Sequence, residues 1–292
     1  MRLPLAALFL ALSSAALAQT PVSKDACLPF AQTLPATVTY GTVAVVGTDG
    51  CVFERVVVPF STRMQVSIGR LTVQRLDLAG GAVDKVPPSL RVEAHGLHLG
   101  PHTGNALIDY IGQIQARPMD AVLDYAFDPA SATLRFAEIG VDGRAVGHLK
   151  LSAEIVGFDP DAVTAPGVPP IGKAGLKSLR LHFENLGFFE GFVAVPIASA
   201  LLQDAADPAA RMDAIKAQVR AALPVVLANA DPATIAALGD FVGAFPHPDK
   251  TLDLTIDLPV PASVEDLLAR LGQPTEIAKS LPAGSIKARY GE

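Results

Sequence analysis

The stretch MDAVLDYAFDPASATLRFAEIGVDGRAVGHLKLSAEI, residues 119–155, decides the fold class of this chain. Apolar and polar residues alternate along its last part and define two opposite faces: Leu149, Leu151, Ala153 and Ile155 against Lys150, Ser152 and Glu154. Because successive side chains of a strand point to opposite faces, this period of two predicts a strand with one apolar face. Asp128-Pro129-Ala130 and Asp142-Gly143 are typical of turns between antiparallel strands.

The same alternation recurs along most of the chain, around residues 64–68, 90–94, 123–128, 179–184, 252–258 and 286–290. Strands with one apolar and one polar face are typical of antiparallel sheets with one solvated side. The sequence therefore predicts an α+β fold, a β-rich antiparallel meander with an inserted helical block and a C-terminal strand-helix-strand unit. At Arg75 the alternation shifts phase, which predicts a bulge.

Helical signals concentrate in the second half of the chain. Asp207-Pro208 and Asp231-Pro232 each combine an N-cap aspartate with proline at the first helical position. A more apolar helix is predicted from about Glu190 to Gln203, and a short one follows Ser263, with Asp266 completing its capping box.

Prolines and glycines at 166–172 predict a loop between two regions, residues 19–165 and 166–292, that pack on the same sheet. About eight to ten strands at ~4.8 Å spacing make a sheet on the order of 40–45 Å wide. A helix covers only ~10 Å of that width, so the predicted helices leave part of the apolar face uncovered. Two outcomes remain open. Either the sheet curls onto itself as a sandwich or partial barrel, or an apolar groove remains for a ligand.

The first residues are typical of a secretory signal peptide that spans residues 1–18. Arg2 precedes an uncharged apolar run at residues 3–12, and Ala16-Leu17-Ala18 is an A-x-A cleavage site that predicts a mature start at Gln19. A lipoprotein would need cysteine at that position. The apolar run at residues 191–203 is too short to span a bilayer. We therefore expect a soluble periplasmic protein with no transmembrane segment after signal cleavage.

The chain has two cysteines, Cys27 and Cys51. In an oxidising compartment an even pair predicts one disulfide, which closes a loop and stabilises the fold by roughly 3.5 kcal/mol in the chain-entropy model. The formal net charge is −6 and no basic cluster occurs, so nucleic acid is not an expected partner.

Sequence motifs of common catalytic sites are missing, among them G-x-S-x-G, H-E-x-x-H, the P-loop and G-x-G-x-x-G. We therefore expect neither an enzyme nor a cofactor. His95, His98 and His102 have metal-binding side chains, but positions three apart on a strand point to opposite faces. A polar strand edge is the favoured interpretation, and the sequence leaves zinc binding by these histidines open. Asp120, Asp124 and Asp128 recur every four residues, which places them on one strand face and predicts a solvated surface.

Phe188, Phe189 and Phe192 begin the helical block and are the candidate ligand-binding residues. Two interpretations apply to them. They pack in the core, or they line a site for an acyl chain or a patch that contacts a membrane.

Several stretches resemble bacterial envelope proteins of the YdgA type and, more loosely, AsmA-like proteins. The resembling stretches lie within about residues 107–290: Tyr110-Ile111-Gly112, residues 119–155, LKSLRLHFENLGFFEGFVA (176–194) and LGDFVGAFPHPDKTLDLTIDLPVPASVEDLL (238–268). The resemblance implies a periplasmic, β-rich protein with helices before a C-terminal strand-helix unit. AsmA-like proteins are linked to lipid movement and outer-membrane assembly, but this chain lacks their membrane anchor and great length. A smaller lipid-binding or envelope-maintenance role is therefore implied, and no functional residue is carried over.

The leading hypothesis is a soluble periplasmic protein that binds a lipid or another apolar ligand and supports envelope maintenance or lipid transport. It rests on the export signal, the excess of apolar sheet face and the resemblance. The alternative is a non-catalytic structural or interaction module of an envelope complex, which uses its sheet edge or its phenylalanine-rich patch to bind an envelope protein.

Overall fold

The structure is a computed structural model that describes residues 25–291, apart from positions 36, 60, 62–63, 77, 79–86, 102, 116, 161–173, 203–205, 264 and 266–280. Four sequence predictions fall outside these residues: the signal peptide at 1–18, the position of His102, the loop at 166–172 and the short helix after Ser263.

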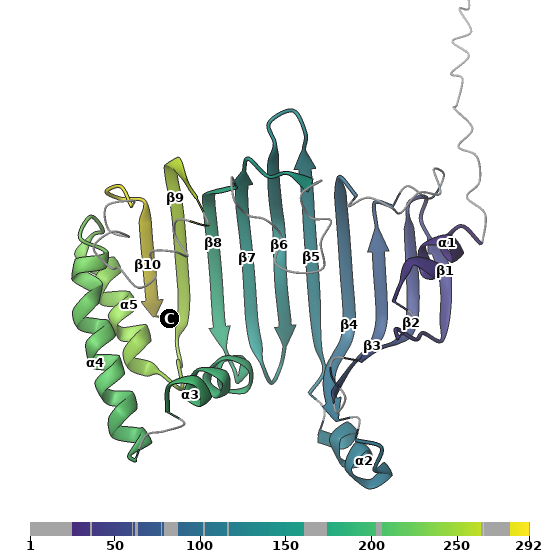
Figure 1. Cartoon of the computed structure of the whole chain (residues 1–292), viewed down its shortest axis with the longest axis horizontal. Coiled ribbons are helices and arrows are strands. Elements are labelled where there is room, and N and C mark those ends of the chain that lie inside the picture. Colours follow the sequence, from purple (N-terminus) through teal and green to yellow (C-terminus); the bar gives the residue numbers. More distant parts are fainter. Residues whose placement is uncertain are drawn as a thin grey trace, which may run out of the picture.

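Ten strands form one antiparallel sheet in the order of the sequence, as Figure 1 shows. They are β1 (Thr42–Val46), β2 (Gly50–Pro59), β3 (Met64–Gln74), β4 (Ser89–Pro101), β5 (Met119–Asp128), β6 (Thr133–Gly143), β7 (Gly147–Val156), β8 (Gly175–Asn185), β9 (Thr251–Ser263) and β10 (Ile286–Gly291). The predicted antiparallel meander is therefore confirmed. The described strands do not form a sandwich or barrel, since β1 and β10 remain the two edges of a single open layer.

One apolar row crosses the whole sheet and shows why these strands associate. Each strand contributes one residue, and direct register links them in the order Val45, Cys51, Val73, Val92, Leu123, Ile139, Leu151, Leu181, Leu254 and Ala288. A register slip of one residue in any strand would turn its apolar side chains to the polar face, so the row specifies the register.

Bulges keep this face apolar while the sheet curves. Register shifts interrupt five consecutive strand pairs, from β4–β5 to β8–β9. In β4 the shift falls at Gly96, whose φ of +65° favours glycine. Ala94 and Leu97 on either side both belong to the core packing, because the extra residue restores the alternation. The bulge predicted at Arg75 does not lie within the ladder, because β3 ends at Gln74; Arg75 instead has a φ of +65° just after the strand.

The helices lie mainly beside the two edge strands of the sheet, and α2 and α3 lie where strands end (Figure 1). They are α1 (Cys27–Thr33), α2 (Ala106–Gln115), the π-helix η2 (Phe189–Ala194), α3 (Val195–Leu202), α4 (Pro208–Val226) and α5 (Pro232–Ala244). Asp207 and Asp231 accept hydrogen bonds from the backbone N–H groups of Ala210 and Thr234, which confirms both predicted N-caps.

Two features of the helices differ from the sequence prediction. The helix expected from Glu190 begins as a π-helix and becomes an α-helix only at Val195. The helices α1 and α2 were not predicted. The helix α1 has only seven residues, and the helical spacing of apolar residues at 107–114, which α2 does have, was overlooked as a signal.

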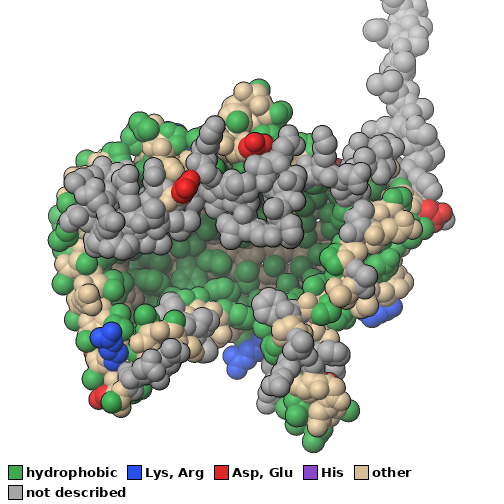
Figure 2. All heavy atoms as spheres, in the orientation of Figure 1, with side chains coloured by type: hydrophobic (Ala, Val, Ile, Leu, Met, Phe, Trp, Pro, Cys, Tyr) green, Lys and Arg blue, Asp and Glu red, His purple; other side chains and the backbone are tan. Residues whose placement is uncertain are grey.

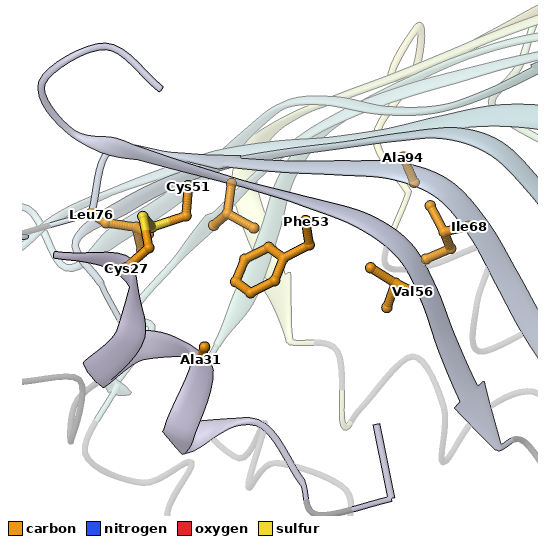
Figure 3. Packing of buried hydrophobic residues seen from close by; sticks show 9 residues of the cluster. Cys27, Ala31, Cys51, Phe53, Val56, Ile68, Leu76 and Ala94 are labelled. Carbon is orange, nitrogen blue, oxygen red and sulfur yellow. A yellow bond between two sulfur atoms is a disulfide. The ribbon is translucent and has the colours of Figure 1, made fainter. Parts of the chain in front are cut away.

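The main buried core lies at the β1–β4 end, where α1 packs on the sheet (Figure 3). Phe53, Val56 and Ile68 are buried there, together with the two cysteines. At the other end α5 packs on β10, and α4 packs on α5. The apolar face is therefore covered by helices at its ends, while the strands between them carry no such layer among the described residues.

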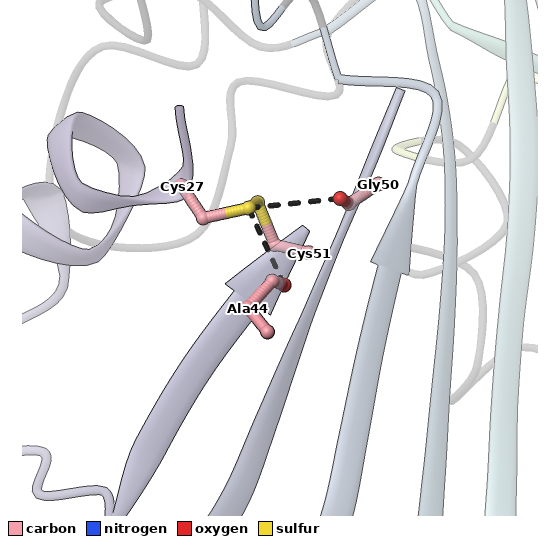
Figure 4. Close-up of a disulfide and its surroundings, with 4 residues drawn as sticks. All are labelled: Cys27, Ala44, Gly50 and Cys51. Atoms are coloured by element: carbon pink, nitrogen blue, oxygen red, sulfur yellow. Dashed lines mark hydrogen bonds between the residues drawn. A yellow bond between two sulfur atoms is a disulfide. The ribbon is translucent and has the colours of Figure 1, made fainter. Parts of the chain in front are cut away.

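A disulfide joins α1 to β2, as predicted. The Cα atoms of Cys27 and Cys51 are 5.7 Å apart, and both residues are almost fully buried. The sulfur of Cys27 also lies 3.6 Å from the carbonyl oxygens of Ala44 and Gly50 (Figure 4). Because a disulfide sulfur carries no proton, these are polar contacts and not hydrogen bonds in the ordinary sense. A disulfide is typical of proteins outside the cytoplasm.

Candidate apolar binding face

The inward face of β5–β8 is the candidate site. The side chains on it are apolar and aromatic, and most of them keep partial exposure: Leu123, Tyr125, Phe127, Phe136, Ile139, Val141, Leu149, Leu151, Ala153, Ile155, Leu176, Leu179 and Leu181. Of the large side chains on the inward face of these four strands, only Leu134 and Phe183 are buried. Figure 2 shows a hollow over this part of the sheet, with hydrophobic side chains on its floor.

This partial exposure is unusual for an apolar sheet face. Side chains of the same row are buried at both ends, where Cys51 is 0% exposed and Ala288 is 7% exposed. The difference follows from the helices, because α1 packs on β1 and α5 packs on β10, while no described helix packs extensively on β6 or β7. Contiguous exposed apolar surface of this kind marks an interaction or ligand site in soluble proteins.

An aromatic hollow of about 400 Å³ lies at one end of this face. Its walls combine Tyr125, Phe127 and Phe136 with loop residues that include Pro87 and Phe158. The hydroxyl of Tyr125 donates a hydrogen bond to the carbonyl oxygen of Pro87 at 3.1 Å, so its polar atom is satisfied while the ring faces the hollow. Burial raises the pKa of this hydroxyl, which keeps it neutral.

A second hollow, of about 430 Å³, lies between α3, α4 and the segment after α5. Its lining includes Ala198, Met212 and Phe245. Lys216 stands at its edge, where its ammonium group donates to the carbonyl oxygen of Phe245 at 3.1 Å and lies 3.3 Å from a carboxylate oxygen of Asp213. Both hollows are of the size that small apolar ligands occupy in proteins.

The candidate residues Phe188, Phe189 and Phe192 are not among the residues that line either hollow. Phe189 is surrounded by rings, with centroid distances of 5.8 Å to Phe241 and 5.5 Å to Phe245. It therefore packs η2 against α5. Phe192 is 40% exposed, so it remains free to contact another molecule. Ligand binding by these three residues stays a prediction.

The sequence reasoning missed the residues that line the aromatic hollow. The period of two already places Tyr125 and Phe127 on one face, which is a signal for the strand residues. No comparable signal exists for Pro87 and Phe158, because loop residues join the hollow only through the tertiary fold.

The outward face of the same strands is polar and holds pairs of histidine and carboxylate. His95 lies 3.1 Å from Asp120, His148 lies 2.6 Å from Asp142, and His182 lies 2.7 Å from Asp253. The backbone N–H of Gly96 and the His95 ring together lower the pKa of the Asp120 carboxyl. These pairs link neighbouring strands on the solvated side of the sheet.

The expectation that His95 and His98 point to opposite faces is wrong. Gly96 is an extra residue between them, so both lie on the face opposite Ala94 and Leu97. Among the described residues, which do not include His102, no group of three or more His, Cys, Asp or Glu residues is placed to hold a metal ion.

The expected solvated surface at Asp120, Asp124 and Asp128 also needs a correction. Asp124 is only 7% exposed, because Arg75 and Arg91 close over it. A four-residue spacing places the three carboxylates on one face correctly, but it carries no information about the arginines that neighbouring strands bring to them.

Comparison with known proteins places the chain in a family without assigning an activity. A protein-family model with the description "Uncharacterized protein" matches residues 140–288, and because this is half of the chain, the chain belongs to that family. The match covers β7–β9, the helical block and the start of β10, but not the disulfide. Comparison with curated proteins finds no match. In the described part of the chain, none of the helices has both the length and the apolar character to cross a membrane.

Proposed function

We propose that this chain is a periplasmic protein that binds the acyl chain of a lipid on the inward face of β5–β8 and thereby supports envelope maintenance or lipid transport. The observation that carries the proposal is the continuous apolar row, which is buried at Cys51, Val73 and Ala288 and partly exposed from Val92 to Leu254. The disulfide, the predicted signal peptide and the resemblance to YdgA-type and AsmA-like envelope proteins support the location.

The dimensions of the face fit this ligand. Four strands at ~4.8 Å spacing are about 15–20 Å wide, and the seven residues from Leu149 to Ile155 extend about 20 Å along β7. An acyl chain in one leaflet of a bilayer is about 15 Å long, half of the ~30 Å hydrocarbon core. One such chain would lie along the strands, cover part of the partly exposed side chains and leave its polar headgroup in water.

Acyl binding is tested with a fluorescent fatty acid and a charge placed on the proposed floor. Leu151 is partly exposed in the centre of the row, so Leu151→Glu leaves the glutamate able to reach water when no ligand is bound. An acyl chain on the same surface would have to desolvate the carboxylate. We expect saturable binding by the unaltered protein and at least tenfold weaker binding by Leu151→Glu.

Ser152→Glu is the matched control, because Ser152 is the next residue of β7 and points to the polar face. Its affinity is expected to stay within twofold of the unaltered protein. Equal weakening by both variants, or no saturable binding by the unaltered protein, would contradict the proposal. The latter result would favour the alternative, a non-catalytic interaction module that recruits an envelope protein.

A further inference from the structure

The helix α2 presents its apolar side to solvent. Five of its ten residues are large, apolar and between 43% and 66% exposed: Leu107, Ile108, Tyr110, Ile111 and Ile114. Leu107, Tyr110, Ile111 and Ile114 occupy positions i, i+3, i+4 and i+7, and Ile108 lies beside them. The five residues therefore form a single stripe along the helix. In a core-facing helix such a stripe is turned inward.

Specific contacts hold α2 in this orientation. Gly112 lies so close to Pro101 at the end of β4 that any side chain at this position would overlap the proline ring. Asp109, on the side away from the stripe, accepts hydrogen bonds from the backbone N–H and the hydroxyl of Thr103 at 2.8 and 3.0 Å. The side with Gly112 and Asp109 is thus tied to the protein, and the stripe is left outside.

More exposed apolar residues lie on the side of the molecule where α2 is found, at the ends of the strands. The strands β4 and β8 both end there, and α2 and the η2–α3 segment project from it (Figure 1). Leu186, just before that second segment, and Phe192 and Leu201 within it are all at least 40% exposed. We call this side the α2 edge. Hydrophobic side chains are visible on α2 in Figure 2, beside the hollow over the sheet.

Basic residues accompany the apolar ones at the α2 edge. Arg117 follows α2, and Arg144 lies in the turn between β6 and β7, at the same ends of the strands as α2; both are exposed. The carboxylates of Asp120 and Asp142 lie at the same strand ends but are paired with His95 and His148. Apolar side chains, a tyrosine and flanking arginines are the combination that binds the interface of an anionic bilayer.

We propose that the α2 edge docks on the surface of a lipid bilayer. The α2 helix has ten residues and a length of about 15 Å, too short to span a membrane, so it lies in the plane of the interface. Leu107, Ile111 and Ile114 enter the boundary between headgroups and acyl chains, while Arg117 and Arg144 contact anionic headgroups. This inference rests on the proposed function and deepens it, because it brings the acyl-binding face next to a bilayer, the source of the ligand.

Vesicle flotation tests the docking. We expect the full-length mature protein to float with vesicles that contain an anionic phospholipid, and the triple variant Leu107→Ser, Ile111→Ser, Ile114→Ser to bind at least tenfold more weakly. The matched control is Val219→Ser, Val225→Ser, Val260→Ser, which removes three exposed apolar side chains away from the α2 edge and is expected to bind normally. Arg117→Gln with Arg144→Gln is expected to weaken binding to anionic vesicles more than to neutral ones.

A fluorescence measurement supplies an independent readout, because the chain contains no tryptophan. Ile111→Trp is expected to shift its emission to shorter wavelength when vesicles are added, and Val225→Trp is expected to keep its emission unchanged. Equal shifts at both positions, no flotation of the unaltered protein, or normal flotation of the α2 triple variant would overturn the proposal. So would a dimer that the triple variant abolishes, since a second copy would then cover α2.

Failure of membrane docking can be distinguished from failure of acyl binding. The α2 triple variant is expected to bind the fluorescent fatty acid in solution as the unaltered protein does, whereas Leu151→Glu is expected to float normally. Flotation without fatty-acid binding would refute the acyl-binding face and leave the docking edge standing. Fatty-acid binding without flotation would refute the docking edge alone.

Discussion

At the scale of single residues, Asp124 illustrates how the polar face of the sheet is stabilised. Arg75 donates two hydrogen bonds to its carboxylate at 2.7 and 3.1 Å, and Arg91 donates a third at 2.8 Å. The hydrogen bonds from Arg75, followed by those from Arg91, hold the pKa of Asp124 below its usual range although burial acts in the opposite direction. Arg75 lies at the backbone irregularity after β3, so the irregularity directs it toward β5.

The variant Asp124→Asn is expected to lower the free energy of unfolding by about 2 kcal/mol at pH 7, the value of hydrogen bonds to a charged group. Because the pKa of Asp124 is lowered in the folded protein, its contribution is complete above the ordinary aspartate pKa of about 3.9 and is lost as the pH falls through the folded value. Urea unfolding should therefore show a difference between the two proteins that shrinks in acid.

Asp240→Asn is the control for this experiment. Asp240 is a surface carboxylate, 69% exposed and 4.0 Å from Arg220, and such pairs contribute less than about 0.5 kcal/mol. If the difference between Asp124→Asn and the unaltered protein stayed constant down to pH 2, the ion pairs would not be its source.

At the scale of elements, the short helix α1 depends on the disulfide. It has seven residues and no side-chain cap, so it is too short to be stable by itself. Cys27 fastens it to β2, where Ala31 and Cys27 complete the core that contains Phe53. The helix is therefore held by tertiary contacts, which explains why local sequence patterns did not predict it.

Replacement of both cysteines by alanine is expected to lower the free energy of unfolding by about 3 kcal/mol. Urea unfolding monitored by circular dichroism measures the loss. Titration of the unaltered protein with a thiol reagent should detect no thiols in denaturant alone and two after reduction. Two reactive thiols before reduction would show that the pair is not oxidised in the isolated protein.

In the π-helix η2 and the helix α2, tertiary contacts decided a feature that the local sequence did not predict. The segment after Phe188 was predicted as a helix, but its first turn is widened where Phe189 packs among the rings of Phe183, Phe241 and Phe245. The apolar residues of α2 gave no sign of which side would be outside. Both outcomes depend on neighbours that are far away in the sequence.

At the scale of the whole molecule, the protein is a single ten-stranded layer with helices at its ends. Its buried core is consequently concentrated near α1, and the centre of the sheet keeps apolar side chains in partial contact with water. Such surface costs free energy in the unliganded protein, and a ligand that covers it would stabilise the folded state.

Thermal unfolding provides the corresponding prediction. A long-chain fatty acid at about one hundred times its dissociation constant is expected to stabilise the fold by about 2.7 kcal/mol and to raise the Tm by roughly 5–10 °C. A short-chain acid with the same carboxylate is expected to leave the Tm unchanged, because it buries little apolar area. A similar rise in Leu151→Glu would mean that the ligand binds elsewhere.

The sequence by itself determined most of the strands from β3 onward, their apolar faces, the antiparallel meander, the caps at Asp207 and Asp231, and the disulfide. These features depend on local periodicity, on single capping residues or on the presence of just two cysteines, so a reading of neighbouring positions is enough to predict them.

Only the tertiary structure decided that the sheet stays open, that the bulge at Gly96 places His95 and His98 on one face, that two arginines bury Asp124, and that α2 turns its apolar side outward. The physical reason is the same in each case. Burial and orientation depend on which distant segments pack against a residue, and an apolar strand residue has the same local pattern whether a helix covers it or a ligand does.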